Sequence, residues 1–188
     1  MNTRERILDA AAAVMREHGV AQATTKQIAR AAGYSEALLY KHFRDKEEIL
    51  LHVLRERMPA FPGGAVAGAE TVEANLVAVT DSALRFYLHA FPMMASMVAQ
   101  PRLMAATRET LTGYGAGPRH PVDMLAGYLT AEQNLGRVAA DSSPAAAAAL
   151  LMGACFQQAF LCYFGGGSDF PETAAVDLVR GLLPALLP

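Results

Sequence analysis

The chain has 188 residues, of which 53% are hydrophobic and 18% are charged, and its formal net charge is −2. A chain of this length buries enough surface to fold without disulfides or a structural metal, and so apolar a composition excludes an intrinsically disordered protein. Ala and Leu together supply 59 residues, whereas Val and Ile supply 15. The composition therefore favours helix over strand and predicts an all-α fold.

The cysteine content and the first residues bear on the cellular compartment. Cys155 and Cys162 are too few for a secreted disulfide scaffold, and their spacing of seven helical residues is too wide for a mutual disulfide. We expect buried small side chains at both positions, with a redox role as the alternative. Charged residues from Arg4 to Asp9 interrupt any apolar leader segment. We therefore expect a cytoplasmic protein.

Charge and proline divide the chain unevenly. Residues 1–58 carry a formal charge of +2 and no proline, whereas residues 59–188 carry −4 and all ten prolines. Two prolines and a glycine pair interrupt the helical pattern at residues 58–64. We expect two domains, residues 1–57 and residues 58–188, the first with a chemistry of its own.

The first domain is predicted to contain four short helices. They begin at polar residues that can cap a helix, namely Asn2, Thr24, Ser35 and Asp45. Gly19 and Gly33 can supply the left-handed turns that end the first two. Only Gly33-Tyr34-Ser35 separates the second helix from the third, which is the spacing of a helix-turn-helix.

The third predicted helix, residues 35–43, carries the functional argument. At 100° per residue Leu39 and Phe43 share the core-facing side. The other side presents small, apolar and polar groups that suit phosphate oxygens and base edges: Glu36, Ala37, Leu38, Tyr40, Lys41 and His42. Thr25 and Lys46 add donors at the starts of the neighbouring helices. The pattern indicates a DNA-binding surface; the alternative is an ordinary solvated helix.

These residues resemble the DNA-binding domain of the TetR family over residues 4–57. The resemblance is carried by Thr24-Thr25-Lys26-Gln27-Ile28-Ala29, Ala32-Gly33-Tyr34-Ser35, Leu39-Tyr40-Lys41-His42-Phe43 and Lys46-Glu47-Glu48-Ile49-Leu50. It implies that the helix after Ser35 enters the major groove, that Thr25, Tyr40 and Lys46 hold phosphates, and that the groove-facing residues are Lys26, Glu36, Ala37, Lys41 and His42. Leu38 departs from the family pattern, which often has a hydroxyl residue there.

The resemblance also implies how such a protein works. It would bind a pseudo-palindromic DNA operator as a homodimer and repress transcription until a small-molecule effector releases it. The second part of the chain resembles the family's helical body in architecture only. Its helices are predicted from Glu70 to His89, between Pro92 and Pro101, on to about Thr112, from Pro121 to Leu135, from Pro144 to Phe164, and from Pro171 to Leu187.

The predicted helix from Pro144 to Phe164 is free of charge and long enough to span a bilayer. Two adjacent glutamines and the lack of flanking basic clusters favour a helix buried in protein over a membrane span. In the TetR family the last two long helices form a four-helix bundle between subunits. That resemblance places the dimer interface at Ala154, Cys155, Gln158, Cys162, Leu178 and Leu182.

Methionine and aromatic residues gather between Phe86 and Tyr128, and thioethers adapt to ligands of varied shape. The candidate residues of a pocket for an apolar or aromatic effector are Phe86, His89, Met93, Met97, Met104, Met124 and Tyr128. A plain hydrophobic core explains the same residues equally well.

An enzyme and a helical protein-interaction module are the rival classes. The sequence contains no nucleophile elbow, phosphate loop, His-Glu-x-x-His or paired-cysteine metal motif. We therefore expect no catalytic residues, no metal and no cofactor. If the protein is an enzyme, its catalytic residues come together only in the folded structure and follow no local motif.

Overall fold

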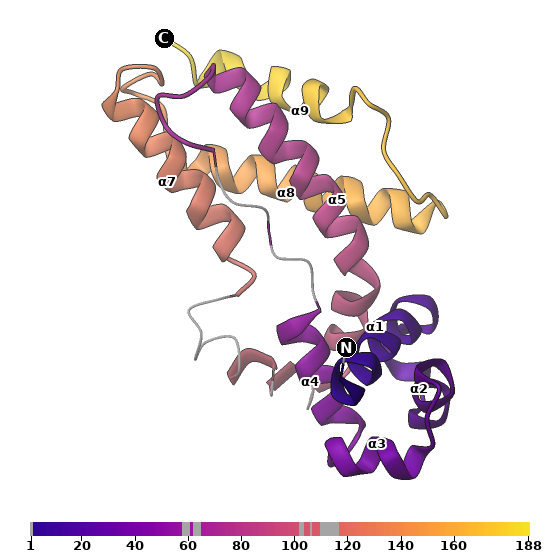
Figure 1. Cartoon of the computed structure of the whole chain (residues 1–188). Coiled ribbons are helices and arrows are strands. Elements are labelled where there is room, and N and C mark those ends of the chain that lie inside the picture. Colours follow the sequence, from indigo (N-terminus) through magenta and orange to yellow (C-terminus); the bar gives the residue numbers. More distant parts are fainter. Residues whose placement is uncertain (1, 58–60, 62–64, 102–103, 106, 110–116) are drawn as a thin grey trace. The chain divides into compact units, whose positions relative to one another are not determined.

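The computed structural model describes residues 2–57, 61, 65–101, 104–105, 107–109 and 117–188. The described residues form helices, turns and loops without a strand (Figure 1), which confirms the all-α prediction. They belong to two compact units: unit 1 is Met1–Pro59 with His89–Gly115, and unit 2 is Ala60–Leu88 with Ala116–Pro188. The predicted break at residues 58–64 lies largely outside the described residues.

Unit 1 begins with four helices: α1 (Thr3–Gln22), α2 (Thr25–Ala32), α3 (Glu36–His42) and α4 (Lys46–Glu56). Each starts after its predicted cap, because the side chains of Asn2, Thr24, Ser35 and Asp45 each accept a hydrogen bond from a backbone N–H three residues on. These bonds satisfy donors that a helix start leaves unpaired. Thr24 and Gln27 form a reciprocal capping box.

Two glycines, one within α1 and one directly after α2, have a left-handed backbone conformation. Gly19 has φ of 73° and kinks α1, which continues for three more residues instead of ending there. Gly33 has φ of 76° in the left-handed region, and its N–H donates to the end of α2. Because a side chain at such a φ is strained, glycine permits the tight turn that leads into α3.

The core of unit 1 is formed by apolar faces of all four helices. Ile7, Leu8, Ile28, Leu39 and Ile49 are each fully buried within it. Leu39 anchors α3 from the inside, as the helical spacing predicts, and Phe43 at the end of α3 is also buried. Because α3 buries Leu39 and Phe43 on its inner side, the orientation of its outer side is fixed.

Ion pairs join the end of α4 to the first turns of α1, although these residues lie far apart in the sequence. The Arg4 guanidinium donates to both oxygens of the Glu56 carboxylate at 2.9 and 2.8 Å. Arg57 pairs in turn with Glu5 and with Asp9, the second at 2.6 Å. Bidentate guanidinium–carboxylate pairs fix orientation as well as distance, so these contacts hold the end of α4 beside the first turns of α1.

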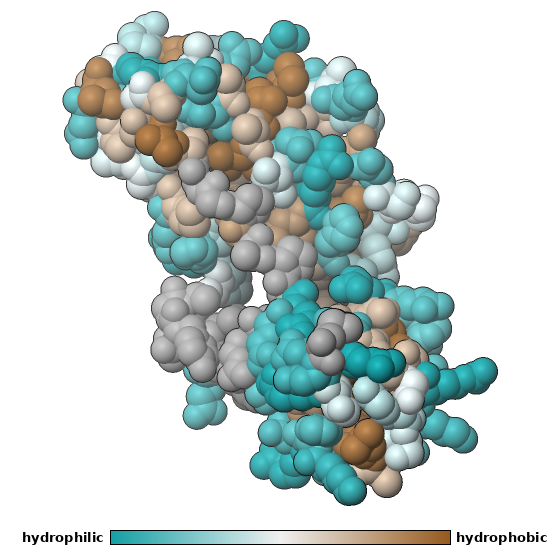
Figure 2. Space-filling model, viewed as in Figure 1, coloured by the Kyte–Doolittle hydropathy of each residue, from teal (hydrophilic) through white to brown (hydrophobic). Residues whose placement is uncertain are grey.

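Later helices are α5 (Val72–Val98), α7 (His120–Asn134), α8 (Pro144–Phe164) and α9 (Ala174–Leu182), followed by the short 3₁₀ turn η1 (Leu183–Ala185). Within unit 2, α8 packs against α7 and α9. Residues 101, 104–105 and 107–109 are also helical, and the rest of the helix predicted up to Thr112 lies outside the described residues. Apolar residues alternate with hydrophilic ones over the upper part of the molecule in Figure 2.

The predicted break at Pro92 is wrong, because α5 continues through this residue to Val98. A proline inside a helix removes one backbone hydrogen bond and crowds the preceding turn. Ser96 donates its hydroxyl to the Pro92 carbonyl at 2.9 Å. Packing also favours the continued helix, since Met93 and Met97 just beyond the proline are buried in the core of unit 1.

Helix α8 is the one described helix that is long and apolar enough to cross a membrane. It has 21 residues, and its most apolar window has a mean hydropathy of 1.6. One third of that window is buried inside the protein, chiefly through Ala148, Leu151, Met152 and Cys155. The rest of this window is exposed or half-buried, so α8 keeps a large apolar surface outside the core.

Candidate nucleic-acid interface

The helix pair α2–α3 presents a polar outer side. With Leu39 and Phe43 buried, Ala37, Lys41 and His42 are exposed, and the Tyr40 ring is 51% exposed. Glu36 and Leu38 are half-buried. In Figure 1, α3 lies at the lower end of the α1–α4 region, and Figure 2 shows mainly hydrophilic side chains over that region in the same view.

Three of the predicted interface residues are joined by a chain of hydrogen bonds. The Tyr40 hydroxyl lies 3.3 Å from the Thr25 Oγ1, to which it donates, and the Thr25 hydroxyl donates to Glu36 Oε1 at 2.7 Å. This contact links the first turn of α2 with the first turn of α3. Sequence reasoning missed it, because the residues are 11 and 15 positions apart and follow no local repeat.

Ser35 and Lys26 occupy the two edges of the same helix pair. Both are exposed. The Ser35 hydroxyl is occupied by capping, since it accepts the Leu38 N–H at 3.2 Å. Lys26 places its ammonium group at the first turn of α2, where donors to phosphate are favoured.

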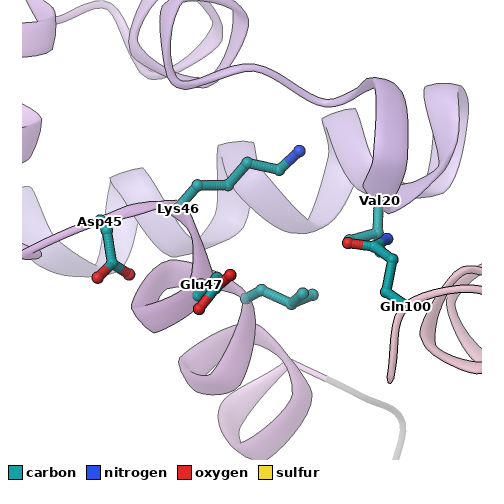
Figure 3. Close-up of a pocket in the computed structure, with 6 residues that line it drawn as sticks. Val20, Asp45, Lys46, Glu47 and Gln100 are labelled. Carbon is teal, nitrogen blue, oxygen red and sulfur yellow. The ribbon is translucent and has the colours of Figure 1, made fainter. Parts of the chain in front are cut away.

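Lys46 starts α4 and lines a cavity of about 430 Å³ within unit 1 (Figure 3). Its ammonium donates to the Ala21 carbonyl at 3.3 Å. Figure 3 shows the neighbouring carboxylates, Asp45 and Glu47, directed away from that ammonium end. Partial burial lowers the pKa of Lys46, because desolvation disfavours the charged form.

The predicted effector-binding residues fall into two sets. Met93 and Met97 belong to the buried core of unit 1, and Met104 packs against that core. Phe86, Met124 and Tyr128 lie in unit 2, where Phe86 and Met124 are half-buried. His89 is exposed at the start of the second segment of unit 1. The core interpretation thus accounts for the first set, and the pocket stays a prediction.

Tyr128 takes part in a buried polar cluster around Glu132. The Tyr128 hydroxyl accepts from Asn75 at 3.1 Å, and burial raises the pKa of Tyr128 to about 12. The fully buried Glu132 carboxylate lies 3.2 Å from Arg137 Nε and accepts from the Gly68 N–H at 3.3 Å. Because a buried charge needs such partners, this cluster holds the segment before α5 on α7.

The predicted dimer residues differ in exposure. Ala154, Gln158, Cys162, Leu178 and Leu182 are half-buried. Cys155 is fully buried with its thiol facing the Thr80 carbonyl, so it lies away from any surface. The exposed apolar side of α8 is formed by residues that include Leu150, Phe156, Phe160, Leu161 and Phe164.

Comparison with known proteins places this interface in a family. Residues 7–53 match the family described as bacterial regulatory proteins, tetR family. Over 55 residues the chain is 49% identical to the HTH-type transcriptional regulator SrpR of Pseudomonas putida. That match covers 29% of this chain and 26% of SrpR, so the chain spans about a quarter of that relative's length.

Solved structures extend the likeness to the whole fold. A TetR-family transcriptional regulator described as putative, from Mesorhizobium loti, superposes with a TM-score of 0.75 at 19% identity, covering 99% of this chain and 97% of its own. SmeT, the repressor of the Stenotrophomonas maltophilia multidrug efflux pump SmeDEF, in complex with triclosan, gives 0.69 at 23% identity, covering 99% and 92%. Residues 7–53 of this chain therefore match the tetR family of bacterial regulatory proteins, and the whole chain shares its fold with solved regulators described as members of that family.

Proposed function

We propose that the protein is a ligand-responsive transcription regulator, which binds a pseudo-palindromic operator as a homodimer in the cytoplasm and represses until a small effector releases it. The observation that carries this proposal is the outer side of α2–α3, where Tyr40 and Lys41 are held outward by the buried Leu39 and Phe43, and Tyr40 contacts Thr25 of α2. Residues 1–57 would make the DNA contacts. Residues 58–188 would supply dimer contacts and the effector site.

The proposed DNA contacts divide by chemistry. Tyr40, Lys46 and Thr25, the last through its backbone N–H at the start of α2, would hold phosphates, which position the protein without reading sequence. Lys26, Ala37, Leu38, Lys41 and His42 would lie in or beside the major groove. Support comes from the exposure of Lys26, Tyr40 and Lys41 on this side of the helix pair.

A homodimer would cover the exposed apolar side of α8. Phe156 and Phe160 are each 42% exposed and Phe164 is 80% exposed. Apolar patches of this kind mark interaction surfaces, and an isologous pair of α8 helices would bury the same residues of both subunits. Two subunits would then place two α3 helices on the two half-sites of one operator.

An apolar or aromatic effector is the proposed ligand. Support comes from the methionine and aromatic content between Phe86 and Tyr128 and from the structural neighbour SmeT, whose solved complex contains triclosan. An enzyme or a module without DNA contact is less supported, since the regulators that match this chain are described as transcriptional regulators. Among the described residues no group of His, Cys, Asp or Glu is arranged for a metal.

Selection from a pool of random duplex DNA tests the proposal. The wild-type protein is expected to enrich one palindromic sequence family, whose affinity falls steeply with salt because phosphate contacts release counterions. Tyr40→Phe, which removes one hydroxyl, should weaken binding to specific and random duplexes by the same factor. Failure of the wild-type protein to enrich any sequence would contradict DNA-binding regulation.

A further inference from the structure

Glu36 is an acidic residue on a surface that otherwise presents hydroxyl groups and cations. It is half-buried in the first turn of α3, beside Tyr40 and on the helix that bears Lys41 and His42. A carboxylate near the phosphate backbone of DNA is repelled by it. Its presence on this side therefore calls for a specific donor that compensates for the repulsion.

Capping of α3 does not require Glu36. Ser35 already caps the helix by accepting the Leu38 N–H, and the reciprocal position of a capping box is occupied by Leu38 rather than by an acid. The Glu36 carboxylate uses Oε1 to accept from Thr25 at 2.7 Å. Within the described part of the chain, no hydrogen bond or ion pair involves Oε2.

Thr25 fixes the direction of this carboxylate. A hydroxyl has one proton, and Thr25 gives it to Glu36 while receiving one from Tyr40. Thr25 and Glu36 come from different helices of the helix-turn-helix, so the bond locks the acid relative to both. An oriented carboxylate with one unengaged oxygen is an acceptor prepared for a donor outside the protein.

We propose that Glu36 determines operator sequence by accepting a hydrogen bond from the N4 amino group of one cytosine in each half-site, with Thr25 as its positioning residue. This inference rests on the proposed function. Of the major-groove base edges, cytosine offers a donor without an adjacent acceptor, whereas guanine and thymine offer acceptors and adenine places N7 beside its amino group. An ionised carboxylate only accepts, so it discriminates in favour of cytosine.

Selection with matched variants provides the first test. Wild type is expected to enrich cytosine at one symmetry-related pair of positions, preferred about tenfold over other bases. Glu36→Gln should change that preference to adenine, because an amide can pair with both N6 and N7, and should leave the other positions unchanged. Thr25→Ser should preserve the cytosine preference. Thr25→Val should reduce the preference for cytosine over the other bases, and not only the affinity for all sequences alike.

A second measurement does not depend on the folding of any variant. In the selected operator the cytosine is replaced by 2-pyrimidinone, which lacks the amino group, paired with guanine. Wild-type affinity should fall about tenfold, and Glu36→Ala should be insensitive to the replacement. An unchanged wild-type affinity, or the same base preference in wild type and Glu36→Gln, would overturn the role of Glu36 while leaving DNA binding intact; no enriched sequence at all would instead overturn the proposed function.

Discussion

Leu38 places an isobutyl group among the polar side chains on the outer side of α3, where it is half-buried. Phosphate oxygens offer this group no favourable contact, whereas the methyl group of thymine is an apolar feature of the major groove. We predict that Leu38 contacts one thymine in each half-site. Replacing that thymine by uracil should cost wild type about 1 kcal/mol per half-site, measured by fluorescence anisotropy.

The matched variant for this prediction is Leu38→Ala, which should respond much less to the same replacement. Uracil at the other thymines of the operator serves as the control and should affect both proteins equally. If no thymine distinguishes the two proteins, Leu38 has no part in reading the sequence.

The two cysteines are predicted to differ sharply in reactivity. Cys155 is fully buried, and burial raises the pKa of its thiol from 9.0 to about 12, so the nucleophilic thiolate is absent at neutral pH. Cys162 is half-buried near the end of α8. In Cys162→Ser, a disulfide reagent at pH 8 should find no fast-reacting thiol until denaturant is added.

Cys155→Ser, which retains Cys162, is the comparison and should react in the folded state. The raised pKa of Cys155 also makes the stability of the fold depend on pH. The unfolded thiol ionises above pH 9 while the folded one stays neutral, so this group favours folding below pH 9 and loses that contribution as pH rises towards 12. Rapid labelling of folded Cys162→Ser would contradict the burial of Cys155.

At the scale of single elements, the turn between α2 and α3 depends on Gly33. Its φ of 76° lies in the region where a side chain is strained. A Cβ added at this position would lie 3.5 Å from the Arg6 guanidinium, which is an ordinary contact. Gly33→Ala should therefore lower the free energy of unfolding by about 1–2 kcal/mol through backbone strain alone. Urea denaturation followed by circular dichroism measures this difference.

Gly181 offers the control for this change. It lies within α9, and a Cβ there would meet no atom within 4 Å. Gly181→Ala should leave stability unchanged or raise it by up to about 1 kcal/mol. Equal effects of the two substitutions would show that the left-handed conformation at Gly33 is not what matters.

The start of α4 depends on ionised Asp45. Its carboxylate accepts the Glu48 N–H at 2.8 Å, and this bond, with the nearby Arg44, lowers the pKa of Asp45. Asp45→Ala should cost about 1 kcal/mol at pH 7. Because the pKa is lowered in the folded state, the ionic contribution is present above the ordinary value of 3.8 and is lost as pH falls below it.

Denaturation of wild type and Asp45→Ala over a pH series tests this prediction. The difference in stability should narrow on the acid side of pH 4 and be constant between pH 6 and 8. A difference that does not depend on pH would assign the effect of Asp45 to helix propensity rather than to its charge.

At the scale of the whole molecule, the exposed apolar side of α8 is predicted to hold two subunits together. Phe160→Glu would bury a charge without a partner in that interface, at a cost of several kcal/mol. Sedimentation should therefore show a wild-type dimer and a monomeric variant, and operator affinity should fall with assembly. Val98→Glu is the control, since Val98 is an exposed apolar residue of unit 1. It should remain a dimer.

Much of the fold could be predicted because its signals are local. Ser35 and Asp45 cap the helices that follow them, Gly33 ends α2, and the spacing of Leu39 and Phe43 orients α3. Each of these depends on residues within about one helical turn, where geometry follows from the backbone itself. The same reasoning placed the candidate DNA-binding side on α3 without tertiary information.

Contacts between distant residues were decided only by the tertiary structure. The bonds from Thr25 to Glu36 and from Arg4 to Glu56 span 11 and 52 positions, and no local period relates their members. Met93 lies in the core of unit 1, and α5 passes through Pro92. Burial of apolar surface outweighs local preference at these places, so the sequence determines where helices begin and face, and packing determines which of their side chains meet.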